Sequence, residues 1–202
     1  LIHKLYMKLA ALFSGGKDST YSIYKAKQMG HDVRCLITLF PKSPNSHLLH
    51  FPSIKLTKLQ SETMNIPHLV TELETDETNQ EMKVLGILLK KAKQDFQIDG
   101  LVHGGISSEF QKKRFENICK ENDLNILTPL WKMNPKEYMN DLIDSDFKFI
   151  LTSVSSDGLD ETWLGKIITI SDLSKLSELK NINKKRPALC GPFEFKPDSH
   201  PG

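Results

Sequence analysis

The stretch that decides the fold is "KLAALFSGGKDSTYSIYKAKQMG" (residues 8–30). Its apolar start ends at a turn, which predicts a short buried strand. Two glycines between serines follow, and residues 18–29 then carry Tyr21, Tyr24 and Lys25 at helical spacing. Gly30 comes next and is a common helix stop. The stretch therefore predicts a strand, a glycine-rich loop and a helix, in that order.

The glycine-rich loop has the composition of an anion-binding loop. Because glycine has no Cβ atom, the backbone N–H groups of Gly15 and Gly16 can approach an anion closely. The start of the following helix adds partial positive charge, and Lys17 adds a full charge. The loop does not match the mononucleotide pattern G-x-x-x-x-G-K-[ST], because Ala11 replaces its first glycine and Asp18 follows the lysine. The hydroxyl donors of the loop are Ser14, Ser19 and Thr20.

Strand and helix patterns alternate along the rest of the chain. Apolar runs predict further strands at residues 33–40, 67–73, 100–105, 125–131 and 147–154. Helical periodicity predicts helices at residues 54–64, 77–95, 108–121, 135–144 and near 171–180. The six strand patterns, with the first one at residues 8–13, alternate with helices, which predicts an α/β fold with a doubly wound parallel sheet of the Rossmann-like type. We expect five strands in that sheet. We expect an ATP-binding domain at residues 7–154 and a small substrate-side appendage at residues 155–202.

Composition excludes several classes of protein. The net charge of +2 on 202 residues, with only three arginines, gives no reason to expect a nucleic-acid partner. The three cysteines lie far apart and form no C-x-x-C pair, which argues against a disulfide framework or a zinc site and favours a cytoplasmic location. The apolar runs are too short for a membrane span.

The segment "SGGKDS" (14–19), placed after an apolar strand, resembles the PP-loop of the ATP pyrophosphatases, which have the adenine nucleotide alpha hydrolase type of fold. The resemblance implies that the loop, with Thr20 beside it, binds the β- and γ-phosphates of ATP as the leaving pyrophosphate. It also implies Mg²⁺ near Asp18. A loop that stabilises charge on the leaving group accelerates its departure.

Further segments resemble the diphthine–ammonia ligases within that superfamily. The specific one is "HGGISSEFQKKRFENIC" (103–119), and weaker ones are "LLHFPSI" (48–54), "PLW" (129–131) and "VSSDGLDETWLG" (154–165). The resemblance implies that ATP activates the carboxylate of diphthine, a modified histidine of translation elongation factor 2, as an adenylate. Ammonia then displaces AMP to form diphthamide. The expected partners are elongation factor 2 and ammonium, with no membrane or nucleic acid, and a homodimer is one open assembly.

The resemblance also implies roles for individual residues. Asp18, Glu109 and Arg114 are the catalytic candidates, and Asp18 is the metal candidate. Glu109 faces either the trimethylammonium group or ammonia, or only stabilises the start of its helix. Arg114 pairs with a carboxylate or phosphate, or lies on a solvated helix surface. Trp131 lines the pocket or is a core aromatic. The remaining binding candidates are His50, Gly104, Ser107, Ser108 and Gln111.

One family segment departs from its pattern, and other functions stay open. The ligases carry a late segment rich in glycine and glutamate, where this chain has only "CGPFEF" (190–195). The first alternative is a PP-loop tRNA-modifying enzyme, against which the net charge and the absence of a C-x-x-C pair argue. The second is a nucleotide-binding sensor that has lost turnover, which the altered late segment favours.

Overall fold

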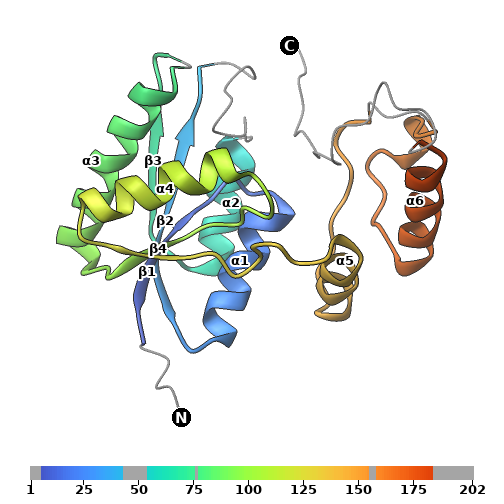
Figure 1. Ribbon diagram of the computed structural model, residues 1–202, viewed down its shortest axis with the longest axis horizontal. Helices are drawn as coiled ribbons and strands as arrows, with labels where there is room; N and C mark the ends of the chain where they lie inside the picture. Colours follow the sequence, from blue (N-terminus) through green and yellow to red (C-terminus); the bar gives the residue numbers. More distant parts are fainter. Residues whose placement is uncertain (1–5, 43–53, 76, 155–157, 184–202) are drawn as a thin grey trace. The chain divides into compact units, whose positions relative to one another are not determined.

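A computed structural model describes residues 6–42, 54–75, 77–154 and 158–183 of the chain (Figure 1). The chain forms two compact units, Leu1–Lys132 and Met133–Gly202. The first unit contains the whole sheet.

The N-terminal unit alternates strands and helices in the expected order. Its elements are β1 (Lys8–Leu12), α1 (Lys17–Gln28), β2 (Asp32–Phe40), α2 (Ile54–Met64), β3 (His68–Glu72), α3 (Thr78–Phe96), β4 (Gly100–Val102), α4 (Glu109–Glu121) and β5 (Asn125–Leu127). All neighbouring strands are parallel, in the order β3-β2-β1-β4-β5. This arrangement confirms the predicted doubly wound, five-stranded parallel sheet.

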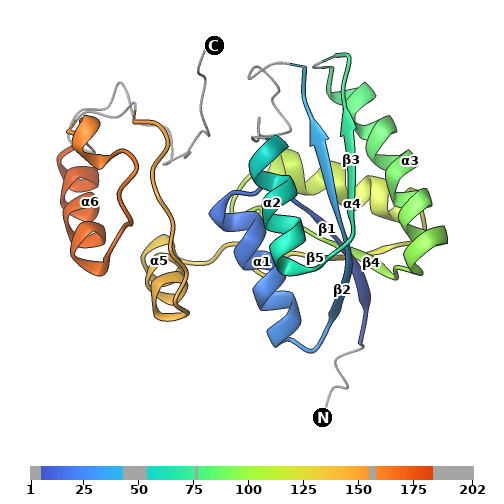
Figure 2. The same cartoon turned by 180° about the vertical axis from the view of Figure 1, so that it is seen from behind.

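Two apolar layers cover the two faces of the sheet. Successive residues of a strand point to opposite faces, so Ala10 of β1 packs with the layer under α3 and α4, while its neighbours Leu9 and Ala11 pack with the layer under α1. The views from the front and from behind show α3 on one side of the sheet and α1 with α2 on the other (Figures 1 and 2). Both faces are buried, which explains the continuous apolar runs of the central strands.

Two thiols lie inside the layer under α3 and α4. Cys35 of β2 and Cys119 of α4 are buried and free, at 0% and 1% exposure. Burial raises the pKa of each thiol to about 12. Both side chains therefore act as small apolar packing residues at neutral pH.

The C-terminal unit is small and mostly helical. It contains α5 (Pro135–Asp144), the 3-10 helix η1 (Glu161–Trp163) and α6 (Ile170–Asn183). Asn134 caps α5 by accepting hydrogen bonds from the N–H groups of Lys136 and Glu137. A separate apolar cluster holds the unit together, formed by Leu151, Trp163, Ile168 and Leu176.

The strand expected at residues 147–154 does not join the sheet. Ile150 and Leu151 form only isolated bridges, with Ile167 and Leu164 of the C-terminal unit. Its alternating apolar residues instead bury Leu151 in the small cluster, at 3% exposure. The segment belongs to the compact unit Met133–Gly202.

No helix in the described parts of the chain combines the length and the apolar character that crossing a membrane requires.

Candidate functional site

The glycine-rich loop lies where the direction of the sheet connections reverses. β1 has β2 on one side and β4 on the other, so the chain leaves β1 and β4 toward opposite faces of the sheet. In open parallel sheets of this kind, ligands bind outside the carboxyl ends of the strands at such a point. The loops that follow β1 and β4 are therefore the expected walls of a ligand site.

The loop backbone needs glycine at one position at least. Gly15 has φ of +75°, a left-handed conformation that disfavours residues with a side chain. Gly16 is the N-cap of α1, and having no side chain it places no oxygen over the first-turn N–H groups. The amino end of α1 is thus shaped to receive an anion.

The hydroxyl groups of the loop hydrogen-bond to the loop itself. Ser19 Oγ donates to the Gly16 carbonyl at 3.0 Å and accepts from the Ser14 N–H at 3.3 Å. Thr20 Oγ1 also donates to the Gly16 carbonyl, at 3.0 Å. Ser14 Oγ accepts from the Gly16 N–H at 3.4 Å. These three hydroxyls, expected from the sequence as phosphate donors, also hold the loop in its shape.

Lys17 and Asp18 form a close ion pair at the start of α1. Lys17 Nζ lies 2.6 Å from Asp18 Oδ1, and the lysine side chain is only 11% exposed against 38% for the aspartate. Mg²⁺ in nucleotide sites uses one or two carboxylates together with phosphate oxygens and water. The described residues contain no cluster of three or more metal ligands. A single loop carboxylate such as Asp18 fits a metal that a nucleotide brings with it.

Gly104 joins the two loops. A Cβ atom on Gly104 would lie 2.5 Å from the carbonyl oxygen of Asp18 and 2.8 Å from the backbone nitrogen of Ser19. The loop after β4 therefore packs directly on the first turn of α1, with no room for a side chain. Sequence reasoning selected Gly104 as a binding residue, and the structure shows that it makes this close backbone contact.

The rest of the second loop is anchored on α4 and on the segment after β5. Ser108 caps α4 by accepting a hydrogen bond from the Gln111 N–H at 3.3 Å. Lys132 donates its backbone N–H to the Ile106 carbonyl at 2.8 Å. Ser107 is exposed beside them. The residue that follows the segment "PLW" is thus hydrogen-bonded to the second loop.

His103 is a buried histidine at the start of this loop. It is 2% exposed, its Nδ1 accepts from the Gly105 N–H at 3.0 Å, and its ring meets Phe115 edge-on at 5.0 Å. Burial, and secondarily the charge of Lys112, lowers the pKa of His103 to about 4. The imidazole is therefore neutral at pH 7, with its proton on Nε2.

The candidates on α4 have these surroundings. Glu109 is 71% exposed and lies 3.8 Å from Lys132 Nζ. Arg114 stacks its guanidinium on the Phe110 ring at 3.5 Å and donates to the Phe110 carbonyl at 3.4 Å. Trp131, half-buried, carries the ammonium of Lys112 at 4.5 Å from its ring centre. The ring of Trp131 is therefore in contact with the Lys112 cation. His50 falls outside the described residues.

Sequence reasoning missed three side chains that hold the glycine-rich loop. Thr38 Oγ1 donates to the Phe13 carbonyl at 2.6 Å, and His68 Nε2 lies 2.6 Å from the same hydroxyl. Gln60 Nε2 of α2 donates to the Gly15 carbonyl at 3.0 Å. None of these contacts follows from spacing along the chain, because they depend on strand register and helix packing.

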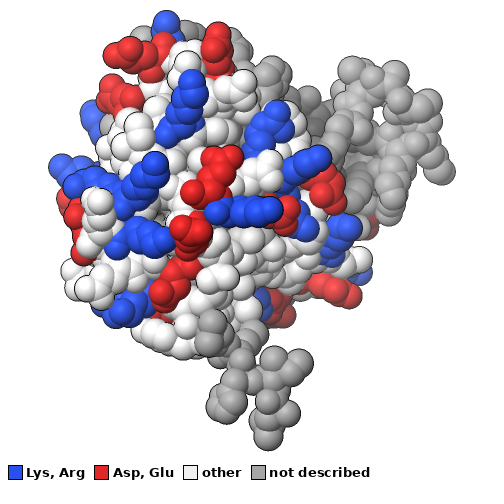
Figure 3. Space-filling view, turned by 60° about the vertical axis from the view of Figure 1, so that its left-hand side comes forward, with Lys and Arg blue, Asp and Glu red and all other residues white. Residues whose placement is uncertain are grey.

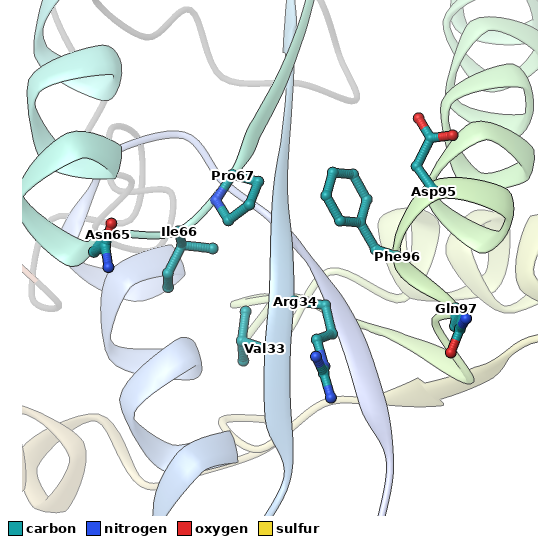
Figure 4. A pocket seen from close by; sticks show the side chains of 8 residues that line it. All are labelled: Val33, Arg34, Asn65, Ile66, Pro67, Asp95, Phe96 and Gln97. Carbon is teal, nitrogen blue, oxygen red and sulfur yellow. The ribbon is translucent and has the colours of Figure 1, made fainter.

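The cavity shown in Figure 4 lies at the other end of the sheet. It measures about 430 Å³, and among its lining residues are Val33 at the start of β2, Pro67 just before β3 and Gln97 just before β4. The carboxyl ends of the strands, where the glycine-rich loop begins, are opposite. This cavity is therefore separate from the candidate site.

One face of the molecule shows no concentration of positive charge. On the face that includes α3, lysine side chains are interspersed with acidic ones (Figure 3). An example is the pair of Lys91 and Asp95, 2.8 Å apart on α3. A surface of this kind lacks the basic stripe that binds a nucleic-acid backbone.

Comparison with known proteins gives matches over most of the chain. The model of the diphthamide synthase N-terminal domain matches residues 7–126, and that of the diphthamide synthase C-terminal domain matches residues 134–191. The diphthine–ammonia ligase of Mus musculus is 31% identical over 184 residues, covering 80% of this chain and 67% of the relative. That of Danio rerio is 27% identical over 205 residues, covering 92% and 78%.

A shorter match concerns a different activity. The tRNA-specific 2-thiouridylase of Helicobacter pylori is 37% identical over 70 residues, covering 35% of this chain and 20% of the relative.

Proposed function

Because this chain belongs to the diphthamide synthase family, we propose that it is an ATP-dependent ligase that converts diphthine and ammonia into diphthamide. The observation that carries the proposal is the contact between the two loops at the switch point of the sheet. There Gly104 of the segment "GGISSEF" packs on the backbone of Asp18 in "SGGKDS". This contact between the two segments that resemble the family supports the proposal that they act as one site.

The proposed reaction has two steps. In the first, a carboxylate oxygen of diphthine attacks the α-phosphorus of ATP, the bond from that phosphorus to the bridging oxygen breaks, and pyrophosphate leaves. In the second, the nitrogen of ammonia attacks the carboxyl carbon, the bond from that carbon to the AMP oxygen breaks, and AMP leaves. The nitrogen loses a proton and an amide remains. Adenylation is needed because a free carboxylate oxygen is a poor leaving group.

The chain's own residues fit the first step. The amino end of α1 and the ammonium of Lys17 stabilise the charge that develops on the departing pyrophosphate. Ser14, Ser19 and Thr20 keep the loop in the shape that this binding requires. Asp18 would hold Mg²⁺ together with the phosphates, and the metal would neutralise part of their charge. Positioning and charge stabilisation then account for most of the rate.

The second loop and α4 are proposed to bind the acyl side of the reaction. Ser107, Ser108 and Gln111 offer polar groups at the start of α4, and Arg114 offers a cation for a carboxylate or a phosphate. Glu109 offers a carboxylate for the trimethylammonium group or for ammonium. His50 stays a binding candidate. Residues 155–202 would act on the substrate side, with elongation factor 2 as the protein substrate and the cytoplasm as the place of reaction.

A single experiment tests the proposal. The purified protein is incubated with ATP, Mg²⁺, ammonium and elongation factor 2 that bears diphthine, and AMP, pyrophosphate and the mass of the factor are measured. We expect AMP and pyrophosphate in equal amounts, together with conversion of the carboxyl group to the amide. Omitting ammonium or diphthine should each stop amide formation. A folded protein that binds ATP without turnover would favour the sensor function instead.

The second candidate is modification of a tRNA base, which the match to the thiouridylase favours. The same assay separates the two functions when unmodified tRNA replaces elongation factor 2. Release of pyrophosphate that depends on tRNA, and not on diphthine, would support the second candidate.

A further inference from the structure

Two linked hydrogen bonds run across the sheet to Phe13, the residue just before the glycine-rich loop. Thr38 in β2 donates its hydroxyl proton to the Phe13 carbonyl at 2.6 Å. His68 at the start of β3 lies 2.6 Å from the same hydroxyl oxygen through its Nε2. Three parallel strand segments are therefore connected through side chains at the point where the chain leaves β1.

The direction of each hydrogen bond follows from the groups involved. The Phe13 carbonyl can only accept, so the single proton of the Thr38 hydroxyl points to it. The hydroxyl oxygen must then accept from His68, whose Nε2 consequently carries a proton. Burial lowers the pKa of His68, so the neutral ring with this one tautomer is the form present at pH 7. The ring also meets Phe13 edge-on, with 6.0 Å between ring centres.

The peptide group between Phe13 and Ser14 is held at both ends. Its carbonyl accepts from Thr38, and its N–H group donates to Ser19 Oγ at 3.3 Å. A peptide group is planar, so fixing both of its polar atoms fixes the orientation of its plane. The loop begins at this plane, which therefore sets the direction in which the next N–H groups point.

Thr38 is completely buried, so its hydroxyl cannot replace the hydrogen bond to the Phe13 carbonyl by a hydrogen bond to water. Without the hydroxyl, the Phe13 carbonyl would lose its side-chain partner next to a loop that must bind anions. We propose that Thr38 and His68 are positioning residues for the pyrophosphate half of the nucleotide, acting through the Phe13–Ser14 peptide group. This inference rests on the proposed function of the loop, and it gives the third strand of the sheet a share in that function.

The test compares variants by calorimetric binding of inorganic pyrophosphate with Mg²⁺, of ATP with Mg²⁺, and of adenosine. Thr38→Val keeps the shape of the side chain and removes the hydroxyl. We expect it to lower the affinities for pyrophosphate and ATP about tenfold, equal to about 1.4 kcal/mol, and to leave the affinity for adenosine unchanged. Thr38→Ser should restore binding to within about threefold of the original. His68→Leu should also lower the affinity for pyrophosphate, and His68→Gln should recover part of that loss.

The matched control is Thr63→Val. Thr63 donates its hydroxyl to the Leu59 carbonyl at 2.8 Å on the exposed side of α2, so the chemical change is the same at a place away from the loop. It should alter none of the three affinities. A purely structural role of Thr38 would lower the unfolding temperature and leave the ratio of pyrophosphate to adenosine affinity unchanged, which would overturn the inference.

Two further outcomes are separable. If the unmodified protein binds pyrophosphate and Thr38→Val and His68→Leu bind it equally well, the inference is wrong and the proposed function stands. If the unmodified protein binds neither pyrophosphate nor ATP, both are wrong. Should Thr38→Val fail to fold, the comparison of His68→Leu with His68→Gln decides in its place, because His68 lies half-buried on the edge strand.

Discussion

Replacing Gly104 by alanine tests whether the contact between the two loops controls nucleotide binding. The new Cβ atom would lie 2.5 Å from the Asp18 carbonyl oxygen, 2.6 Å from its carbon and 2.8 Å from the Ser19 nitrogen. All three atoms belong to backbone, so no side-chain rotation relieves the clash. One of the two loops must move away by about 0.9 Å to restore an ordinary contact of 3.4 Å. This retreat would move the first turn of α1 relative to the loop after β4.

The expected effect has two parts. Overpacking of this kind lowers the free energy of unfolding by about 1–3 kcal/mol, which lowers the unfolding temperature by several degrees. A displacement near 1 Å of groups that position a reaction lowers the rate by about 100-fold. We therefore expect Gly104→Ala to form AMP about 100-fold more slowly than the original protein, in the assay with ATP, ammonium and diphthine-bearing factor.

The control is Gly86→Ala in α3. There the added Cβ atom would lie 3.1 Å from Cδ1 of Ile118, the end of a flexible side chain, and alanine favours the helix. This variant should fold and turn over normally. If Gly104→Ala formed AMP at the original rate, the reasoning that the two loops act as one site would be refuted.

Four other predictions concern the loop, a buried histidine and the C-terminal unit. Gly15→Ala should destabilise the protein more than Gly30→Ala in urea unfolding. Both glycines have positive φ, so alanine costs about 1–2 kcal/mol of backbone strain at either position. Only at Gly15 would the added Cβ atom also clash with a neighbour, Oε1 of Gln60 at 2.5 Å. The pKa of His103 lies near 4 in the folded chain against 6.5 when unfolded, so the unfolded chain binds the proton first as the pH falls. The free energy of unfolding should therefore fall from pH 6.5 to pH 4, by at most about 1.4 kcal/mol per pH unit. His103→Gln should make the part of this fall between pH 7 and pH 5 less steep in urea unfolding. Asp18→Ala should lower AMP formation at least about 100-fold with an unchanged circular dichroism spectrum, and normal turnover would exclude Asp18 from the site. Asp172→Ala should speed hydrogen exchange at the start of α6, by about 1 kcal/mol of lost protection, because the Asp172 carboxylate accepts hydrogen bonds from the N–H and hydroxyl groups of Thr169, which precedes the helix. Protection equal to the original would contradict this role.

Local pattern was enough for most of the fold. The helix expected at residues 54–64 has those bounds in the structure, and the alternation of strands and helices gave the parallel sheet. The exception is residues 147–154. Alternating apolar residues indicate an extended segment with one buried side, and such a segment looks the same whether its partner is a sheet or a small separate cluster. Only the contacts of Leu151 with the C-terminal unit decide between the two.

The site divides in the same way. The glycine-rich loop could be recognised because its function depends on residues adjacent in the chain, and Gly104 because it stands in a second such segment. Thr38, Gln60 and His68 could not, since each acts on the loop from a different element. A threonine inside a predicted strand looks like any β-branched residue until the register places its hydroxyl beside a carbonyl.

The burial of Cys35 and Cys119 makes the chain its own reporter of unfolding. The thiolate is the form that reacts with alkylating reagents, and a pKa near 12 leaves almost none of it at pH 8. In a Cys190→Ser background, only these two of the three cysteines remain, so the rate of alkylation measures how often the layer beneath α3 and α4 opens. Nucleotides that bind the closed form slow that opening in proportion to their affinity, which turns a simple mass-spectrometric time course into a ligand screen.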